Sequence, residues 1–180
     1  EFYHNSVLPY NWVGYGEAGA IYASDTINIT GKTSFVGNDG FNSSAIRART
    51  INISAPSIFK DNLAYASPSA AICSYTSLTI SSDIVLENNI AVNMYGGEEY
   101  NSFEIYVGGT FALSGNLDIQ STNTTAAIYL CADKFINVTN YIAREHTVYL
   151  ATPAAGENVV YSTNANYLSP MKNYPFVCKN

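Results

Sequence analysis

Charged side chains are scarce in this sequence: Asp, Glu, Lys and Arg make up only 12% of its 180 residues. Nor does it hold an apolar run as long as a membrane-spanning helix requires. The formal charge of −6 at pH 7 argues against a nucleic-acid-binding protein, because such proteins carry a basic face. No basic amphipathic segment suits a membrane surface either. We therefore expect neither a nucleic acid partner nor direct membrane insertion.

With so few charges, the polar surface must come from Ser, Thr, Asn and Tyr. The chain has 15 Tyr and 20 Asn residues. Asn favours turns and disfavours helix interiors, whereas Tyr is common in strands. No window carries apolar residues at the i, i+3, i+4, i+7 spacing of an amphipathic helix. These features predict an all-β chain, and its length suits one domain.

An internal repeat of 24 to 27 residues organises the first half of the chain. Each copy has a small residue before Ile, then an alternating I-x-I or L-x-I triplet, and then F-x-x-N or L-x-x-N. Three copies cover residues 19–38, 44–62 and 70–89, and two degenerate ones cover 105–115 and 127–140. Alternation at period two indicates strands with one inward and one outward face.

Three short strands in a repeat of this length are typical of one coil of a solenoid. We therefore predict a right-handed parallel β-helix of about six to seven rungs, with a C-terminal cap. Residues 1–140 form the rungs in this interpretation, and residues 141–180, which contain Pro153, Pro170 and Pro175, form a final coil and the capping tail. Phe2–Asn5 matches the last third of a copy, so we expect the first rung to be incomplete and the chain to be part of a longer protein.

Strand parity predicts which side chains point inward. The inward positions are Ile21, Ile46, Ile72, Ile105 and Ile128 on the first strand of each copy, and Ile27, Ile29, Ile51, Ile53, Leu78, Ile80, Phe111, Leu113, Ile136 and Val138 on the second. The residues that follow the first-strand Ile then form an outward ladder: Tyr22, Arg47, Cys73, Tyr106 and Tyr129.

The F-x-x-N element predicts two further ladders. Phe35, Phe59 and Leu86 should stack in the core as one column. Asn38, Asn62 and Asn89 should lie at the turn that follows, where their amides can satisfy backbone groups of neighbouring rungs.

These motifs resemble those of the chlamydial polymorphic membrane proteins and related adhesin-like β-helix proteins, which repeat G-G-A-[ILV] and F-x-x-N. Here Ala18–Ile21 departs from the first motif at one position, and the resemblance covers roughly residues 1–90. It implies a surface-exposed or secreted protein, in many cases an adhesin. It implies no particular binding residue.

The β-helix architecture is shared with pectate-lyase-like enzymes, which need clustered carboxylates on one outward face. The position before each first-strand Ile, which we expect to point outward, holds Ala20, Ala45, Ala71, Glu104 and Ala127, so no two acids lie on adjacent rungs. His4 and His146 have no partner pattern. We therefore expect no catalytic residue, no metal site and no cofactor.

The outward ladder of Tyr22, Arg47, Tyr106 and Tyr129 has two interpretations. Exposed aromatic rings in a row can stack on sugar rings or contact a protein. Equally, cross-strand stacking of Tyr stabilises a sheet without any ligand.

Cysteines and glycosylation motifs bear on location. Cys73, Cys131 and Cys178 lack metal-binding spacing, and we predict a Cys131–Cys178 disulfide bond that pins the cap, with Cys73 as a thiol; the alternative is three thiols in a reducing compartment. The N-x-S/T motifs, which are candidate glycosylation sites if they do not simply reflect the composition, are Asn28, Asn42, Asn52, Asn123 and Asn137.

The sequence therefore favours a structural or adhesive extracellular module that is not an enzyme. Its partner would be another protein or a glycan at a cell surface, or further copies of itself. Two alternatives stay open: a self-assembling β-solenoid filament subunit, and a pectate-lyase-like carbohydrate-active or sugar-binding protein.

Overall fold

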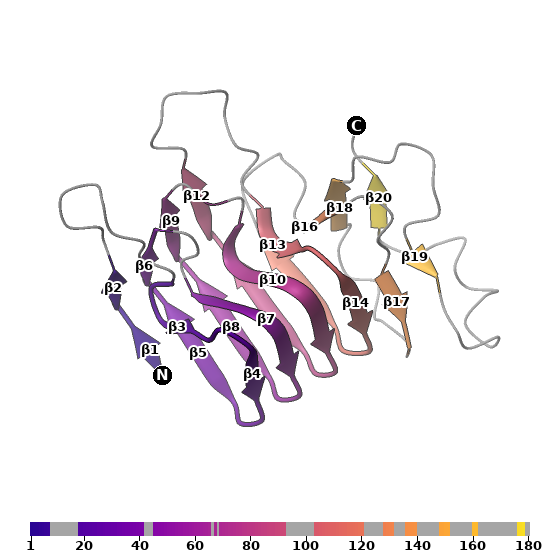
Figure 1. The fold of residues 1–180 in the computed structure, drawn as a ribbon, viewed down its shortest axis with the longest axis horizontal. Helices are drawn as coiled ribbons and strands as arrows, with labels where there is room; N and C mark the ends of the chain where they lie inside the picture. The colour runs from indigo at the N-terminus through magenta and orange to yellow at the C-terminus, as the bar shows by residue number, and fades with distance from the viewer. Residues whose placement is uncertain are drawn as a thin grey trace.

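The computed structural model of the chain describes residues 1–7, 18–41, 45–65, 67, 69–92, 103–120, 128–131, 136–139, 148–151, 160–161 and 176–178. Within these ranges every element of regular secondary structure is a β-strand, and every strand pair is parallel. The prediction of an all-β chain is thereby confirmed for the described residues. Strands from the start of the chain lie at one end of the long axis of the molecule, and strands from its C-terminal part lie toward the other end (Figure 1).

The described strands form three sheets. A five-stranded sheet has the order β1 (Phe2–Tyr3), β5 (Thr33–Val36), β8 (Ser57–Lys60), β11 (Ile84–Glu87), β15 (Leu117–Gln120). A four-stranded sheet has the order β12 (Ile90–Val92), β9 (Leu63–Tyr65), β6 (Asp39–Gly40), β2 (Ser6–Val7). An eleven-stranded sheet contains β3 (Ile21–Tyr22), β4 (Thr26–Ile29), β7 (Ile46–Ile53), β10 (Ser69–Ile80), β13 (Phe103–Val107), β14 (Thr110–Leu113), β16 (Ile128–Leu130), β17 (Ile136–Val138), β18 (Val148–Ala151), β19 (Val160–Tyr161) and β20 (Phe176–Cys178).

The chain visits these sheets in a fixed order. From β7 in the eleven-stranded sheet it passes to β8 in the five-stranded sheet and β9 in the four-stranded sheet, and β10, β11 and β12 repeat the cycle. The two strands expected at the start of each copy are continuous in β7 and β10. The strand after the motif Asn, as in β9, is an additional element that the sequence analysis did not identify.

The side chains predicted to point inward form the core. All fifteen are buried except Ile21, which is partly buried and packs against the same cluster. The register aligns like with like: Ile27 pairs with Ile51, and Ile51 with Leu78. Burial of such columns supplies the main driving force for folding, on the order of 25 cal/mol per Å² of apolar surface.

The predicted aromatic column lies in the five-stranded sheet. The Phe2 and Phe35 rings stack with centroids 5.0 Å apart, and those of Phe35 and Phe59 with centroids 4.8 Å apart. Leu86 pairs in register with Phe59 and continues the column. Phe35, Phe59 and Leu86 are fully buried.

The structure also brings the motif asparagines into hydrogen-bonding contact, at the turn from the five-stranded to the four-stranded sheet. Asn38 Nδ2 donates to Asn62 Oδ1 at 2.9 Å, and Asn62 Nδ2 donates to Asn89 Oδ1. Each Oδ1 also accepts a bond from the backbone N–H of the preceding Asn, as at Asn62 N–H to Asn89 Oδ1. Each Nδ2 donates in addition to the carbonyl of the preceding motif aromatic residue, as at Asn62 to Phe35 O, 3.1 Å. Asn38, Asn62 and Asn89 are buried, and these bonds satisfy their amides.

The residue before each motif Asn has a left-handed backbone. His4, Gly37, Asp61 and Asn88 have φ angles of 49°, 62°, 52° and 54°. Gly adopts this region without cost, and Asn, Asp and His adopt it more readily than other residues. The two variable positions of F-x-x-N are therefore not equivalent, because the second one must tolerate the turn.

One set of inward and outward assignments is wrong. Ala45, Ala71 and Glu104, which we expected to point outward, are buried. The register shifts between Ser69 and Ile72, where β10 has two residues opposite the single Glu104 of β13. Such a bulge interrupts alternation, so parity counted from Ile72 and Ile105 does not hold at Ala71 and Glu104.

The buried Glu104 carboxylate lies at the end of the asparagine ladder. Asn89 Nδ2 donates to Glu104 Oε2 at 2.7 Å. The ladder thus runs from Asn5 through three buried amides to a carboxylate, and this link was not predicted.

The described strands of the predicted final coil and cap continue the eleven-stranded sheet. β18 pairs with β16, β20 with β18, and β19 with β17. The prolines expected to mark the cap, Pro153, Pro170 and Pro175, lie outside the described residues.

Candidate functional site

The predicted outward ladder lies in register across the part of the eleven-stranded sheet that is formed by β3, the first residues of β7 and β10, β13 and β16. Tyr22 pairs with Arg47, Arg47 with Cys73, Cys73 with Tyr106, and Tyr106 with Tyr129. The structure therefore brings Tyr22, Arg47, Tyr106 and Tyr129 onto one face.

Cys73 departs from the prediction, because its thiol is fully buried instead of facing solvent. Tyr75 lies next to it on the surface and is 42% exposed. Between the pairs Ser74–Ala48 and Ser77–Thr50, β10 has two residues, Tyr75 and Thr76, where β7 has only one. This bulge directs the Tyr75 ring onto the ladder.

Buried polar groups and glycines support the bulge. Ser74 Oγ donates to the carbonyls of Arg49 at 3.1 Å and Ser77 at 2.8 Å. In the next layer Gly108 and Gly109 face the bulged backbone, and a Cβ at Gly109 would collide with the Thr76 carbonyl. Only glycine lets the two backbones approach this closely.

A series of ring contacts links Arg47, Tyr75, Tyr106 and Tyr129 on this face. The Arg47 guanidinium carbon lies 5.0 Å from the Tyr75 ring centroid, a cation–π contact. Tyr75 meets Tyr106 edge-on at 5.9 Å, and Tyr106 stacks on Tyr129 at 5.4 Å with 4° between the ring planes. We call Tyr22, Arg47, Tyr75, Tyr106 and Tyr129 the tyrosine–arginine face.

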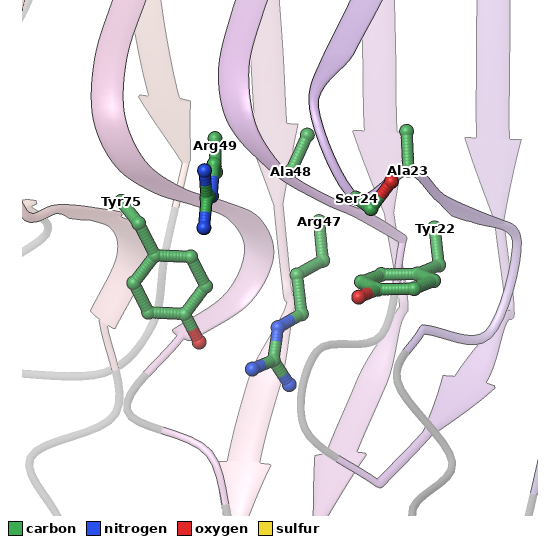
Figure 2. A pocket seen from close by; sticks show the side chains of 7 residues that line it. All are labelled: Tyr22, Ala23, Ser24, Arg47, Ala48, Arg49 and Tyr75. Atoms are coloured by element: carbon green, nitrogen blue, oxygen red, sulfur yellow. The ribbon is translucent and has the colours of Figure 1, made fainter.

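A cleft of about 210 Å³ opens at one end of this face. In Figure 2 the Arg47 side chain extends between the Tyr22 and Tyr75 rings, and Arg49 lies beside Tyr75. The residues that line the cleft are Tyr22, Ala23, Ser24, Arg47, Ala48, Arg49 and Tyr75, and none of them is acidic. The cleft is therefore locally cationic, although the chain as a whole carries a formal charge of −6.

The hydroxyls of Tyr75 and Tyr106 stay protonated near neutral pH. Burial raises the pKa of Tyr75, and the Cys73 thiol beside it acts in the same direction. Burial is also the main cause that raises the pKa of Tyr106, followed by its contact with Cys131. Neutral hydroxyls can both donate and accept hydrogen bonds to a ligand.

The predicted Cys131–Cys178 disulfide bond is not present. Cys131 is a thiol, with its Sγ 3.1 Å from Tyr106 Oη. Cys178 pairs with Leu150, which pairs with Ile128, so Cys178 lies two strands away from Ile128 and Cys131 lies three residues further along the chain. Two interstrand spacings are roughly 10 Å, beyond the Cα separation of about 7 Å that a disulfide allows.

Three of the candidate glycosylation sites lie on the part of the eleven-stranded sheet that is formed by β4, the last residues of β7 and β17. Asn28 is exposed and Asn52 and Asn137 are half-buried, all with outward parity. Asn52 Nδ2 donates to Asn28 Oδ1 at 2.8 Å, so of these two Asn28 has the less engaged amide nitrogen. Asn42 and Asn123 lie outside the described residues.

The structure describes one of the two histidines. His4 is exposed, with its Nδ1 3.2 Å from Gly37 O, and His146 lies outside the described residues. Within the described ranges no group of three or more His, Cys, Asp and Glu side chains could hold a metal ion. The same ranges contain no helix of the length and apolarity needed to span a bilayer.

Sequence analysis identified four of the five residues of the tyrosine–arginine face but missed Tyr75 and the cleft residues Ser24 and Arg49. The sequence does contain a signal for the bulge: the inward positions Ile46 and Ile51 are five residues apart, whereas Ile72 and Leu78 are six apart, as are Ile21 and Ile27. The copy in β7 is therefore one residue shorter than that in β10, and Tyr75 lies where the two strands differ in length. Comparison with family models, with curated proteins and with solved structures finds no match for this chain.

Proposed function

We propose that this chain is an extracellular, non-catalytic binding module built as a right-handed parallel β-helix of six to seven rungs with a C-terminal cap. Parallel pairing in all three sheets and the regular order in which the chain visits them support the β-helix. Kinship with the polymorphic membrane proteins and adhesin-like proteins, and a position at the cell surface, form part of the same proposal.

The tyrosine–arginine face is the observation that carries the binding function. Its rings are aligned by the parallel register, and Tyr22 and Tyr75 are 52% and 42% exposed. Rigid, partly exposed aromatics beside an Arg are the residue types that dominate binding hot spots. A row of them spanning several strands offers an elongated contact surface for a glycan or a protein.

A binding screen with matched variants tests this function. The intact chain would be screened against arrays of glycans and extracellular proteins, alongside Tyr22→Ser and Tyr106→Ser. We expect both substitutions to weaken binding to whatever ligand the screen identifies. Tyr3→Ser is the matched control, because Tyr3 is 63% exposed but lies in the five-stranded sheet.

The alternative interpretation of the face, as cross-strand stacking alone, predicts a different result. In that case Tyr106→Ser would lower the melting temperature and leave ligand binding unchanged. Light scattering over a range of concentrations tests the filament alternative, because the average particle mass of a self-assembling protein would increase with concentration.

The surface location has a test of its own. Protease treatment of intact source cells should cleave the protein, whereas cytosolic markers should stay intact. Protection from the protease until the cells are lysed would contradict the extracellular proposal.

A further inference from the structure

We infer that the cleft beside Tyr22 binds a carboxylate-bearing pyranose residue of an anionic glycan; this inference rests on the proposed binding function of the same face. It follows from the charge of the cleft, the orientation of its arginines, the position of its exposed ring and its size.

The charge of the cleft points to an anionic ligand group. Arg47 and Arg49 both belong to β7, and both line the cleft. Within the described part of the chain Arg49 forms no ion pair, and none of the lining residues is acidic. A guanidinium group matches a carboxylate through two parallel hydrogen bonds, which makes arginine the preferred side chain for this anion.

Arg47 places a fixed positive charge in the wall of the cleft, with its Nε and Nη1 atoms buried, while the exposed Arg49 offers its guanidinium to the ligand. The Arg47 guanidinium lies against the Tyr75 ring, 5.0 Å from the centroid, and Tyr75 is in turn held by its edge-on contact with Tyr106. A pre-oriented side chain loses less conformational freedom when a ligand binds. The bulge that places Tyr75 on the surface therefore also fixes the position of the cationic group.

The opposite wall of the cleft suits a sugar ring. The Tyr22 ring is 52% exposed and lies on the far side of Arg47 from Tyr75 (Figure 2). An exposed tyrosine face can stack on the apolar face of a pyranose. Ser24 supplies a hydroxyl that can donate to or accept from a sugar hydroxyl. An acidic peptide would use the arginines but leave the Tyr22 ring and the Ser24 hydroxyl without a role.

The volume sets the size of the group that enters. Pockets for drug-sized ligands are about 300–1,000 Å³, whereas this cleft measures about 210 Å³. It therefore accommodates a single sugar residue, and the remainder of the glycan would run over the tyrosine–arginine face toward Tyr106 and Tyr129.

Calorimetry with the intact chain tests the inference. The probes are oligomers of a uronic acid, the same oligomers as methyl esters, a sulfated glycan, and an acidic peptide of equal charge. We expect the free uronate to bind, and esterification to weaken it about ten-fold or more, because a charged hydrogen-bonded pair is lost. The sulfated glycan and the acidic peptide should bind more weakly than the uronate.

Variants locate the site. Arg47→Gln, Arg49→Gln and Tyr22→Ser should each weaken uronate binding several-fold or more, and Arg49→Gln is the variant least exposed to folding effects because Arg49 is a solvent-exposed side chain. Lys60→Gln is the matched control: it removes one positive charge from the five-stranded sheet, where Lys60 pairs with Glu87. Melting temperatures of all four variants would show whether a loss of binding reflects unfolding.

The outcomes separate this inference from the proposed function. Equal binding of free acid and ester, tighter binding of the sulfated glycan or the peptide, or equal effects of Lys60→Gln and Arg49→Gln would each overturn the uronate assignment. If no glycan binds but an extracellular protein binds in a Tyr106-dependent manner, the inference fails and the binding function stands. If neither glycans nor proteins bind, both fail.

Discussion

Asn89 donates a 2.7 Å hydrogen bond from its Nδ2 to Oε2 of the buried Glu104, which places a carboxylate at the end of the asparagine ladder. Hydrogen bonds along a chain polarise one another, so the bond to Glu104 strengthens the bonds that Asn89 makes within the ladder. The stability of three turns is thereby linked to one side chain of the eleven-stranded sheet.

We predict that Glu104→Ala lowers the free energy of unfolding by about 1–3 kcal/mol, because it removes the acceptor of the Asn89 amide. Glu104→Gln keeps an acceptor oxygen and should cost less than Glu104→Ala. Urea unfolding of both variants measures the difference. If the two variants are equally destabilised, the contact with Asn89 does not contribute.

Asn62→Ala should cost about 1–3 kcal/mol or more, since it removes an amide that has bonds to Asn38, Asn89 and the Phe35 carbonyl. Asn28→Ala is the matched control, because Asn28 is an exposed asparagine on a strand. Denaturant unfolding of both proteins is the measurement. Equal midpoints for the two variants would contradict a structural role for the ladder.

The aromatic column makes a size-dependent prediction. Phe59→Ala should lower the free energy of unfolding by about 3–5 kcal/mol, as for a large buried aromatic. Phe59→Leu should cost less, because Leu86 already occupies the next position of the same column. Ile58→Ala serves as control, since Ile58 has the opposite parity and is only half-buried. Thermal melts would contradict the column if Phe59→Ala and Ile58→Ala were equally mild.

The left-handed turn residue makes a conformational prediction. Asp61 has φ of 52°, so Asp61→Val should destabilise the fold by about 1–2 kcal/mol, because a β-branched residue is strained in this region. Asp61→Gly should be close to neutral, since glycine adopts this conformation freely. Chemical denaturation distinguishes the two, and a Val variant as stable as the Gly variant would rule out strain at this turn.

The tyrosines make a prediction about pH. Tyr75 and Tyr106 have pKa values above the ordinary 10.0 in the folded chain, so the unfolded chain ionises first. The stability that these two groups contribute is complete below about pH 10 and is lost as the pH rises through their folded pKa values. Absorbance titration should show a fraction of the tyrosine ionisation above pH 10, to which Tyr75 and Tyr106 contribute.

Substitution identifies this late fraction. Tyr106→Phe should remove part of the absorbance change above pH 10. If the substitution left that change intact, Tyr106 would not be shielded as its burial and its contact with Cys131 indicate.

The amino-acid sequence alone predicts the all-β class, the inward columns and most residues of the tyrosine–arginine face. These follow from local periodicity: alternation decides which side of a strand a residue occupies, and a repeat of constant length aligns Ile46 with Ile72 and Phe35 with Phe59. Within a regular strand, counting is sufficient.

The tertiary structure accounts for the positions where this count fails. Glu104 is buried opposite one bulge and bonds to Asn89, and at a second bulge Tyr75 lies beside Arg47 and next to the buried Cys73. The two bulges are local differences in residue number between neighbouring strands, so they depend on which strands pair. The absence of the Cys131–Cys178 bond has the same origin, since the register of β16, β18 and β20 separates the two residues. Pairing partners are set by packing over the whole core, so the local pattern of a single sequence does not determine them.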